Sequence, residues 1–162
     1  MVKLGDQAPE FRLPSATGNF VSLSDFIGKK NLVLYFYPKD NSPGCTREAC
    51  SFRDSYSAFR ELDAEVIGVS SDNQSSHEKF ASDEQLPFLL SSDPGGKVRR
   101  AYGVKPSLGL IPGRTTFVID KQGIIRYIYS SQIRPDRHVG EALTALRSLT
   151  SQSSPRLASA MI

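Results

Sequence analysis

The segment YPKDNSPGCTREAC, Tyr37–Cys50, holds both cysteines of this 162-residue chain. It follows a run of apolar residues and continues into a helical pattern. Ser42 is a favourable N-cap residue, and Pro43 suits the first helical position, because the N–H that proline lacks would have no helical partner there. Cys45 then falls at the third position of a predicted helix, and Cys50 lies five residues further along. This strand–turn–helix segment determines the fold and the chemistry that we expect.

The start of the predicted helix is a favourable place for an anionic sulfur. Backbone N–H groups in a first helical turn have no intrahelical partners, and together with the helix dipole they favour negative charge. Cysteines at helix N-termini are stabilised as thiolates, which are the nucleophilic form. We therefore predict that Cys45 is a nucleophile. The Ser42 hydroxyl is expected within hydrogen-bonding reach of this sulfur or of an oxygen bound beside it, and Pro38 shields the pocket without adding an N–H donor.

Cys45 also has a plain structural interpretation. It is in register with Ala49 and Phe52 on the apolar face of the helix, and buried cysteines often act as small hydrophobic residues. Its position at the helix start, the neighbouring Gly44 and the nearby second thiol together favour the functional interpretation.

The spacing of the two cysteines excludes a static disulfide within an intact helix. Five helical residues give about 7.5 Å of rise and about 140° of rotation, whereas a disulfide needs α-carbons within about 6.8 Å and converging side chains. A bond between Cys45 and Cys50 would therefore require the first turns to unwind, which suits a catalytic cycle. Zinc is disfavoured, because there is no second cysteine pair and the histidines, His77 and His138, are distant in sequence.

Outside this segment, hydrophobic periodicity predicts alternating strands and helices. In chain order these are a hairpin over 11–23, a strand over 31–37, a helix from 43 to about 63, a strand over 64–70, a helix over 74–86, an extended piece over 87–92, a short helix over 96–104, a hairpin over 115–130 and a closing helix over 134–149. This order predicts an α/β fold with a mixed central β-sheet flanked by helices and an N-terminal β-hairpin. We expect one domain over 1–149 and a mobile tail over 150–162.

Composition narrows the functional classes. The chain is 39% hydrophobic with a net charge of +3, and its basic residues are interspersed with acidic ones, so we expect a solvated surface and no nucleic-acid partner. No apolar run approaches the roughly 18 residues of a membrane span. The first residues, MVKLGDQAPEF, have neither the apolar core of a signal peptide nor the enrichment in arginine and serine of a transit peptide. We expect a cytoplasmic protein, or a plastid stromal or thylakoid-associated one if a transit peptide has been removed.

A cation must stabilise the thiolate, and the sequence offers two candidates. Both histidines lie in polar helical surroundings, so we expect them to face solvent and not to form a cysteine–histidine dyad. Arg114 precedes a predicted central strand, and strand ends and the adjacent loops cluster at one rim of an α/β sheet. Arg47, one turn into the helix, is the competing candidate. Glu48 is placed to orient either arginine through a bidentate pair.

At these residues the sequence resembles a peroxiredoxin. The active-site signature of that family, a proline, three residues, a threonine or serine, two residues and the peroxidatic cysteine, matches Pro38, Ser42 and Cys45. The second cysteine five residues on, in GCTREACSFRDSY, resembles the bacterioferritin-comigratory or peroxiredoxin Q subfamily. Similar segments include EVIGVSSD, LPFLLSSDPGGKVRRAYGV and PGRTTFVIDKQG, so the resemblance covers about residues 3–148.

The resemblance implies a thioredoxin-like fold and a thiol-dependent peroxidase that reduces hydrogen peroxide and alkyl hydroperoxides. It assigns Arg114 to the catalytic site, implies Pro38, Ser42 and Gly44 as substrate contacts, and implies a Cys45–Cys50 disulfide formed after Cys45 becomes a sulfenic acid. It further implies that no metal, haem or flavin takes part, that thioredoxin or a related dithiol protein is the reductant, and that the protein is a monomer.

Two other functions use the same thiol pair. A protein thiol–disulfide oxidoreductase normally shows two residues between its cysteines, whereas this chain has four. A redox sensor or chaperone could use the same switch to regulate a partner, and the sequence leaves that role open.

Overall fold

Five strands form one mixed sheet in the order β5-β4-β3-β6-β7. The strands are β3 (Asn31–Phe36), β4 (Ala64–Ser70), β5 (Leu89–Ser92), β6 (Thr115–Ile119) and β7 (Ile125–Ser130). β3 runs parallel to β4, and β4 parallel to β5, whereas β6 and β7 are antiparallel to their neighbours. The computed structural model describes residues 2–106 and 113–160, of which 152–160 are described by their backbone alone. The predicted mixed α/β sheet is confirmed.

Strand β3 is central because its sequence, NLVLYF, is apolar on both faces. Every residue from Leu32 to Phe36 is buried, as expected for a strand covered on both sides. The expected N-terminal hairpin is also present. It forms a separate two-stranded sheet of β1 (Arg12–Pro14) and β2 (Phe20–Ser22), in which Leu13 pairs with Val21.

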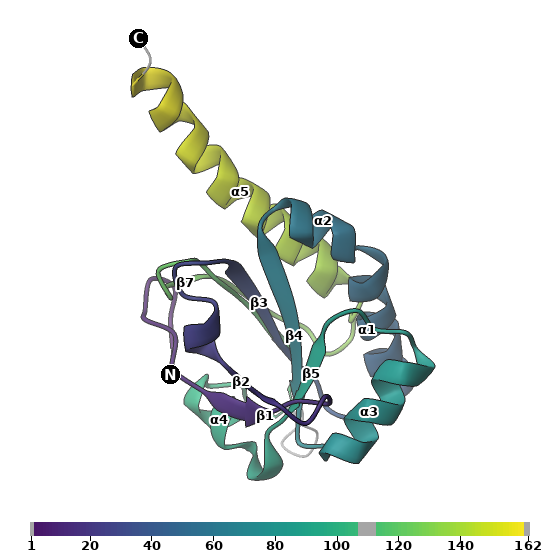
Figure 1. Cartoon of the computed structure of the whole chain (residues 1–162). Coiled ribbons are helices and arrows are strands. Elements are labelled where there is room, and N and C mark those ends of the chain that lie inside the picture. Colours follow the sequence, from purple (N-terminus) through teal and green to yellow (C-terminus); the bar gives the residue numbers. More distant parts are fainter. Residues whose placement is uncertain (1, 107–112, 161–162) are drawn as a thin grey trace.

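Five α-helices complete the fold. They are α1 (Pro43–Asp54), α2 (Tyr56–Glu61), α3 (Gln74–Asp83), α4 (Lys97–Ala101) and α5 (Arg137–Ala160), and two 3-10 helices cover Leu23–Asp25 and Pro94–Gly96. Helices α1, α2, α3 and α5 lie on one side of the sheet, while α4 and the hairpin lie on the other (Figure 1). Among the described residues, no helix is both long and apolar enough to span a membrane.

Two hydrophobic clusters fill the two sides of the sheet. One includes Cys45 and Phe52 of α1 together with Phe80 of α3 and Leu146 of α5. The other joins hairpin residues to the opposite face of the sheet and to the region of α4. The nucleophile that we predicted is therefore built into one of the two cores.

The largest differences from the expected helix boundaries are in two regions. The single helix expected from 43 to about 63 is broken at Ser55, whose backbone (φ −104, ψ 7) is not helical, so that α2 begins as a separate helix. Helix α5 continues to Ala160, beyond residue 149 where we expected the closing helix to end, and its far end projects from the rest of the molecule (Figure 1). The domain boundary and the mobility of the tail stay predictions.

Candidate active site at the start of helix α1

Cys45 lies in the first turn of α1, as predicted. Ser42 is the N-cap residue with an extended backbone, and Pro43 occupies the start of the helix. The first helical hydrogen bond runs from Thr46 N to Ser42 O at 2.9 Å. The Cys45 side chain is almost fully buried, with 1% of its surface exposed. A nucleophile here is shielded from bulk water while remaining beside the unpaired N–H groups of a helix terminus.

Arg114 is the cation beside this sulfur. Its Nη2 donates to Cys45 Sγ at 3.4 Å, and the residue is 5% exposed. Strand pairing explains the meeting of residues so distant in sequence, because Thr115 of β6 pairs with Phe36 of β3 and so brings Arg114 to the end of β3 where α1 begins. A β-carbon at Gly44 would lie 3.2 Å from Arg114 Nη2, so glycine leaves room for the guanidinium.

Glu48 holds the other side of the guanidinium. Its Oε1 accepts from Arg114 Nη1 at 2.6 Å, and both side chains are buried. Burial raises the pKa of Glu48 to about 8, and the guanidinium opposes part of this rise. No described residue hydrogen-bonds Oε2, so the desolvation of this oxygen is not offset. With Glu48 largely protonated at neutral pH, the positive charge of Arg114 is available to Cys45.

The remaining candidates divide into those at the site and those away from it. Arg47, the competing arginine, is exposed on α1, so the structure brings Arg114 and not Arg47 to the sulfur. Ser42 borders the site, but its Oγ donates to Lys39 O at 3.0 Å, so the expected hydrogen bond to the sulfur is not formed in this state. Pro38, partly buried, directly follows Tyr37 at the end of β3.

Cys50 lies on another face of α1, and both cysteines are free thiols. Cys50 is partly exposed, and its Sγ donates to Glu84 Oε2 of the α3 terminus at 3.3 Å. Burial and the adjacent carboxylate raise the pKa of the Cys50 thiol. The separation that we derived from helix geometry is therefore present while α1 is wound.

The prediction that both histidines face solvent is wrong. His77 and His138 are each 0% exposed. His77 Nδ1 lies 2.8 Å from Asp40 Oδ2, which also binds Ser76, and its Nε2 is 3.1 Å from Ser91 O. The polar residues around His77 in the sequence suggested an exposed position, but the imidazole is satisfied inside the protein by Asp40 and Ser91, which lie far from it in the chain. The available signal was that His77 is one turn from the buried Phe80 on the same face of α3.

His138 lies beside Glu48 and bonds Thr116 of β6. Its Nε2 donates to Ser131 O at 2.8 Å, and its Nδ1 accepts from the Thr116 hydroxyl at 2.8 Å. Burial lowers the pKa of His138 to about 4, so it is neutral at pH 7. With Nε2 carrying the proton, Nδ1 offers no hydrogen to Glu48 Oε2, which lies 3.5 Å away.

This burial predicts a pH-dependent contribution to stability. Unfolded His138 takes up a proton below pH 6.5, whereas the folded form does so only near pH 4, so its stabilising contribution is complete above pH 6.5 and is lost as the pH falls toward 4. Glu48, whose pKa is raised, makes a contribution to stability of the opposite sign over an overlapping pH range. The effect of His138 is therefore measured as a difference in unfolding free energy between two proteins. The gap in unfolding free energy between the wild type and His138→Gln should narrow by roughly 3 kcal/mol from pH 6.5 to 4. Urea titrations at several pH values measure this gap, and a constant gap would contradict the assignment.

Arg99 was not among the predicted site residues. The interspersed basic residues were interpreted as solvated surface, yet Arg99 is 8% exposed. Its Nη1 donates to Gly113 O at 2.7 Å and its Nη2 to Tyr37 O at 2.8 Å, so it joins the two backbone segments that carry Arg114 and Pro38. Its position one turn before the buried Tyr102 was the only sequence signal.

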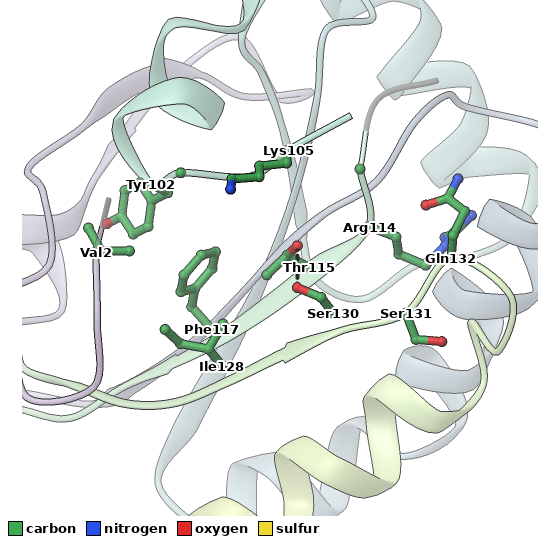
Figure 2. Close-up of a pocket in the computed structure, with 12 residues that line it drawn as sticks. Val2, Tyr102, Lys105, Arg114, Thr115, Phe117, Ile128, Ser130, Ser131 and Gln132 are labelled. Atoms are coloured by element: carbon green, nitrogen blue, oxygen red, sulfur yellow. Dashed lines mark hydrogen bonds between the residues drawn. The ribbon is translucent and has the colours of Figure 1, made fainter. Parts of the chain in front are cut away.

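A cavity of about 540 Å³ adjoins the other side of Arg114. Figure 2 shows Arg114 and Gln132 at one end and Val2 and Tyr102 at the other, with Phe117 between them. Cys45 does not line it. Across the described parts of the chain, no three histidine, cysteine, aspartate or glutamate side chains form a group able to hold a metal ion.

Comparisons with known proteins agree with this geometry. A profile of the AhpC/TSA family matches residues 4–128. The chain is 50% identical over 149 residues to the chloroplastic peroxiredoxin Q of Oryza sativa subsp. japonica, a match covering 91% of this chain and 68% of that protein. The crystal structure of peroxidoxin BcpB from Mycobacterium tuberculosis superposes with a TM-score of 0.84 at 39% identity, covering 91% of this chain and 98% of that one. A cysteine-to-serine mutant of PrxQ from Xylella fastidiosa gives a TM-score of 0.85 at 30% identity, covering 93% of this chain and 98% of that one.

The site places a buried cysteine at the start of a helix, and an arginine donates to its sulfur. Together with the mixed sheet and the structural relatives, this site defines a thiol-dependent peroxidase with a thioredoxin-like fold. The chain belongs to the AhpC/TSA family, within the bacterioferritin-comigratory or peroxiredoxin Q subfamily of peroxiredoxins. The resemblance stated from the sequence is thereby confirmed.

Proposed function

We propose that this protein reduces hydrogen peroxide and alkyl hydroperoxides with Cys45, forms a Cys45–Cys50 disulfide, and is recycled by thioredoxin or a related dithiol protein. The observation that carries the proposal is the 3.4 Å contact between Arg114 Nη2 and the buried Cys45 Sγ at a helix N-terminus. This arrangement favours a thiolate and offers a donor to a peroxide bound beside it.

In the first step the Cys45 thiolate attacks the terminal oxygen of the peroxide. The S–O bond forms, the O–O bond breaks, and the leaving hydroxide or alkoxide takes up a proton as water or alcohol, which leaves Cys45 as a sulfenic acid. Arg114 stabilises the charge that develops on the leaving oxygen. Pro38, Ser42 and Gly44 border the peroxide, and the short loop between β3 and α1 fixes its orientation.

In the second step the first turns of α1 unwind and Cys50 condenses with the oxidised Cys45. Both thiols are free and α1 is fully wound in the present state, which corresponds to the reduced enzyme. Gly44 and Thr46 are poor helix formers close to a helix end, where opening is least costly. The reductant then opens the disulfide by thiol–disulfide exchange.

The setting of the reaction is also a proposal. Curated relatives such as the peroxiredoxins Q of Oryza sativa and Arabidopsis thaliana are chloroplastic proteins, which favours our plastid alternative over the cytoplasmic expectation. We keep the monomeric state, the absence of a metal or organic cofactor, and the absence of a nucleic-acid partner as predictions.

Replacing Cys50 by serine tests the disulfide step. The variant should consume one equivalent of peroxide at the wild-type rate, because the surroundings of Cys45 are unchanged, and should then fail to cycle with thioredoxin. Peroxide consumption coupled to thioredoxin and its reductase measures this. Unimpaired cycling in Cys50→Ser would identify an external resolving thiol. A wild-type protein that consumed no peroxide but reduced insulin disulfides would instead be a protein oxidoreductase.

A further inference from the structure

Glu84, at the end of α3, bonds two residues of α1, Cys50 and Arg53. Its side chain accepts from Cys50 Sγ at 3.3 Å, and its backbone carbonyl accepts from Arg53 Nη1 at 2.7 Å. Cys50 and Arg53 are three residues apart and so share one face of α1. Glu84 is also the C-cap residue of α3, and its N–H donates to Phe80 O and Ser82 O. Its backbone is therefore held by α3 while it bonds the two residues of α1.

The charged groups around Cys50 come from these two helices. Arg53 and Asp54 belong to α1, and Glu84 belongs to the end of α3. Arg53 lowers the pKa of the Cys50 thiol, while burial, Glu84 and Asp54 raise it, and the upward effects dominate. The nearby Lys79 and Asp83 pair with each other at 2.6 Å on the exposed face of α3.

We propose that Glu84 is a positioning residue for the resolving step: it retains the Cys50 thiol against α3 and so retards formation of the Cys45–Cys50 disulfide. This rests on the proposed function. In that step the Cys50 sulfur attacks the sulfenic sulfur of Cys45, the S–S bond forms and the S–O bond breaks. The leaving hydroxide takes up the proton that Cys50 loses, and water departs.

Glu84 opposes this step in two ways. The Cys50 sulfur must leave the carboxylate to reach Cys45, and it must give up the proton that the carboxylate holds by a hydrogen bond. Retention keeps α1 wound, and a wound α1 keeps Cys45 at the helix terminus where it reacts with peroxide. Glu84 thus slows the second step and leaves the reaction of Cys45 with peroxide unchanged.

The test is a single turnover with one equivalent of hydrogen peroxide, with rapid quenching and mass spectrometry to follow sulfenic acid and disulfide separately. The variants are Glu84→Gln, which keeps an acceptor without charge, and Glu84→Ala, which removes both. Asp83→Asn is the matched control, because it removes one carboxylate from the adjacent position without touching Cys50.

Glu84→Gln should form the disulfide about threefold faster at pH 7. Removing the adjacent charge lowers the pKa of the Cys50 thiol, and the resulting gain in thiolate at pH 7 outweighs the accompanying loss of intrinsic nucleophilicity. The pH of half-maximal disulfide formation should fall. Glu84→Ala should be at least as fast, and Asp83→Asn should match the wild type.

The rate of Cys45 oxidation should be the same in all four proteins, because Glu84 contacts the second thiol only. Disulfide formation that kept its rate and pH profile in both Glu84 variants, or that slowed in them, would overturn the inference. A variant that slowed both steps together would show a structural role and would also overturn it. If the wild type formed sulfenic acid but no Cys45–Cys50 disulfide, the proposed function itself would fail, and this inference with it.

Discussion

Replacing Cys45 by serine should abolish peroxide consumption. Serine fills nearly the same space at the start of α1 but provides no thiolate, and loss of a nucleophile costs roughly 10⁴-fold or more in rate. Peroxide consumption with excess dithiothreitol measures the result without depending on any particular protein reductant. The buried site should tolerate this small change, so the melting temperature should stay close to that of the wild type.

Cys50→Ser is the matched control, since it makes the same chemical change at the partly exposed cysteine and should retain full activity with dithiothreitol. Residual turnover by Cys45→Ser above that of a double-serine variant would show that Cys50 reacts directly with peroxide. That result would contradict the assignment of roles to the two cysteines.

Replacing Arg114 by methionine should reduce the second-order rate constant of Cys45 oxidation by about 10²-fold to 10³-fold. Methionine keeps much of the volume but removes both the donor to Cys45 Sγ and the charge available to the leaving oxygen, and loss of one such donor has an effect of this size. Stopped-flow oxidation with hydrogen peroxide measures the rate constant. Arg47→Met, which makes the same change at the exposed arginine of α1, should react like the wild type.

Stability must be separated from chemistry in this variant. Arg114→Met leaves the buried Glu48 carboxyl, which is protonated at neutral pH, without its hydrogen-bond partner, and an unpaired buried polar group destabilises a protein by about 1–3 kcal/mol. The double variant Arg114→Met/Glu48→Leu removes that polar group and should recover stability without recovering the rate. Recovery of both together would mean that Arg114 acts only through the fold.

The sequence predicted the fold and the nucleophile because both depend on local patterns. The apolar run of β3 and the N-cap, proline and glycine ahead of Cys45 are local signals, and each has one simple structural outcome. Arg114 was harder, because its place beside the sulfur depends on the pairing of β6 with β3, which joins segments far apart in the chain. Spacing alone left Arg47 and Arg114 as equals, and the family resemblance decided between them.

The interactions that the sequence did not reveal are those of buried polar groups. His77, His138 and Arg99 were expected at the surface, yet each is buried with partners contributed by distant backbone or side chains. Polarity alone cannot distinguish a solvated residue from one whose hydrogen bonds are satisfied inside the fold. The sequence also did not show that the Ser42 hydroxyl donates to the neighbouring carbonyl of Lys39, and its contact with a bound peroxide stays a prediction.

The two hydrophobic layers have unequal parts in the reaction. Cys45, Ala49 and Phe52 pack in the layer shared with α3 and α5, whereas the layer beneath the hairpin contains no residue of α1. In the resolving step that we propose, opening of α1 would therefore disturb packing on one side of the sheet only. Packing on the opposite side would stay intact, so each turnover would require local refolding of one layer and not of the whole domain.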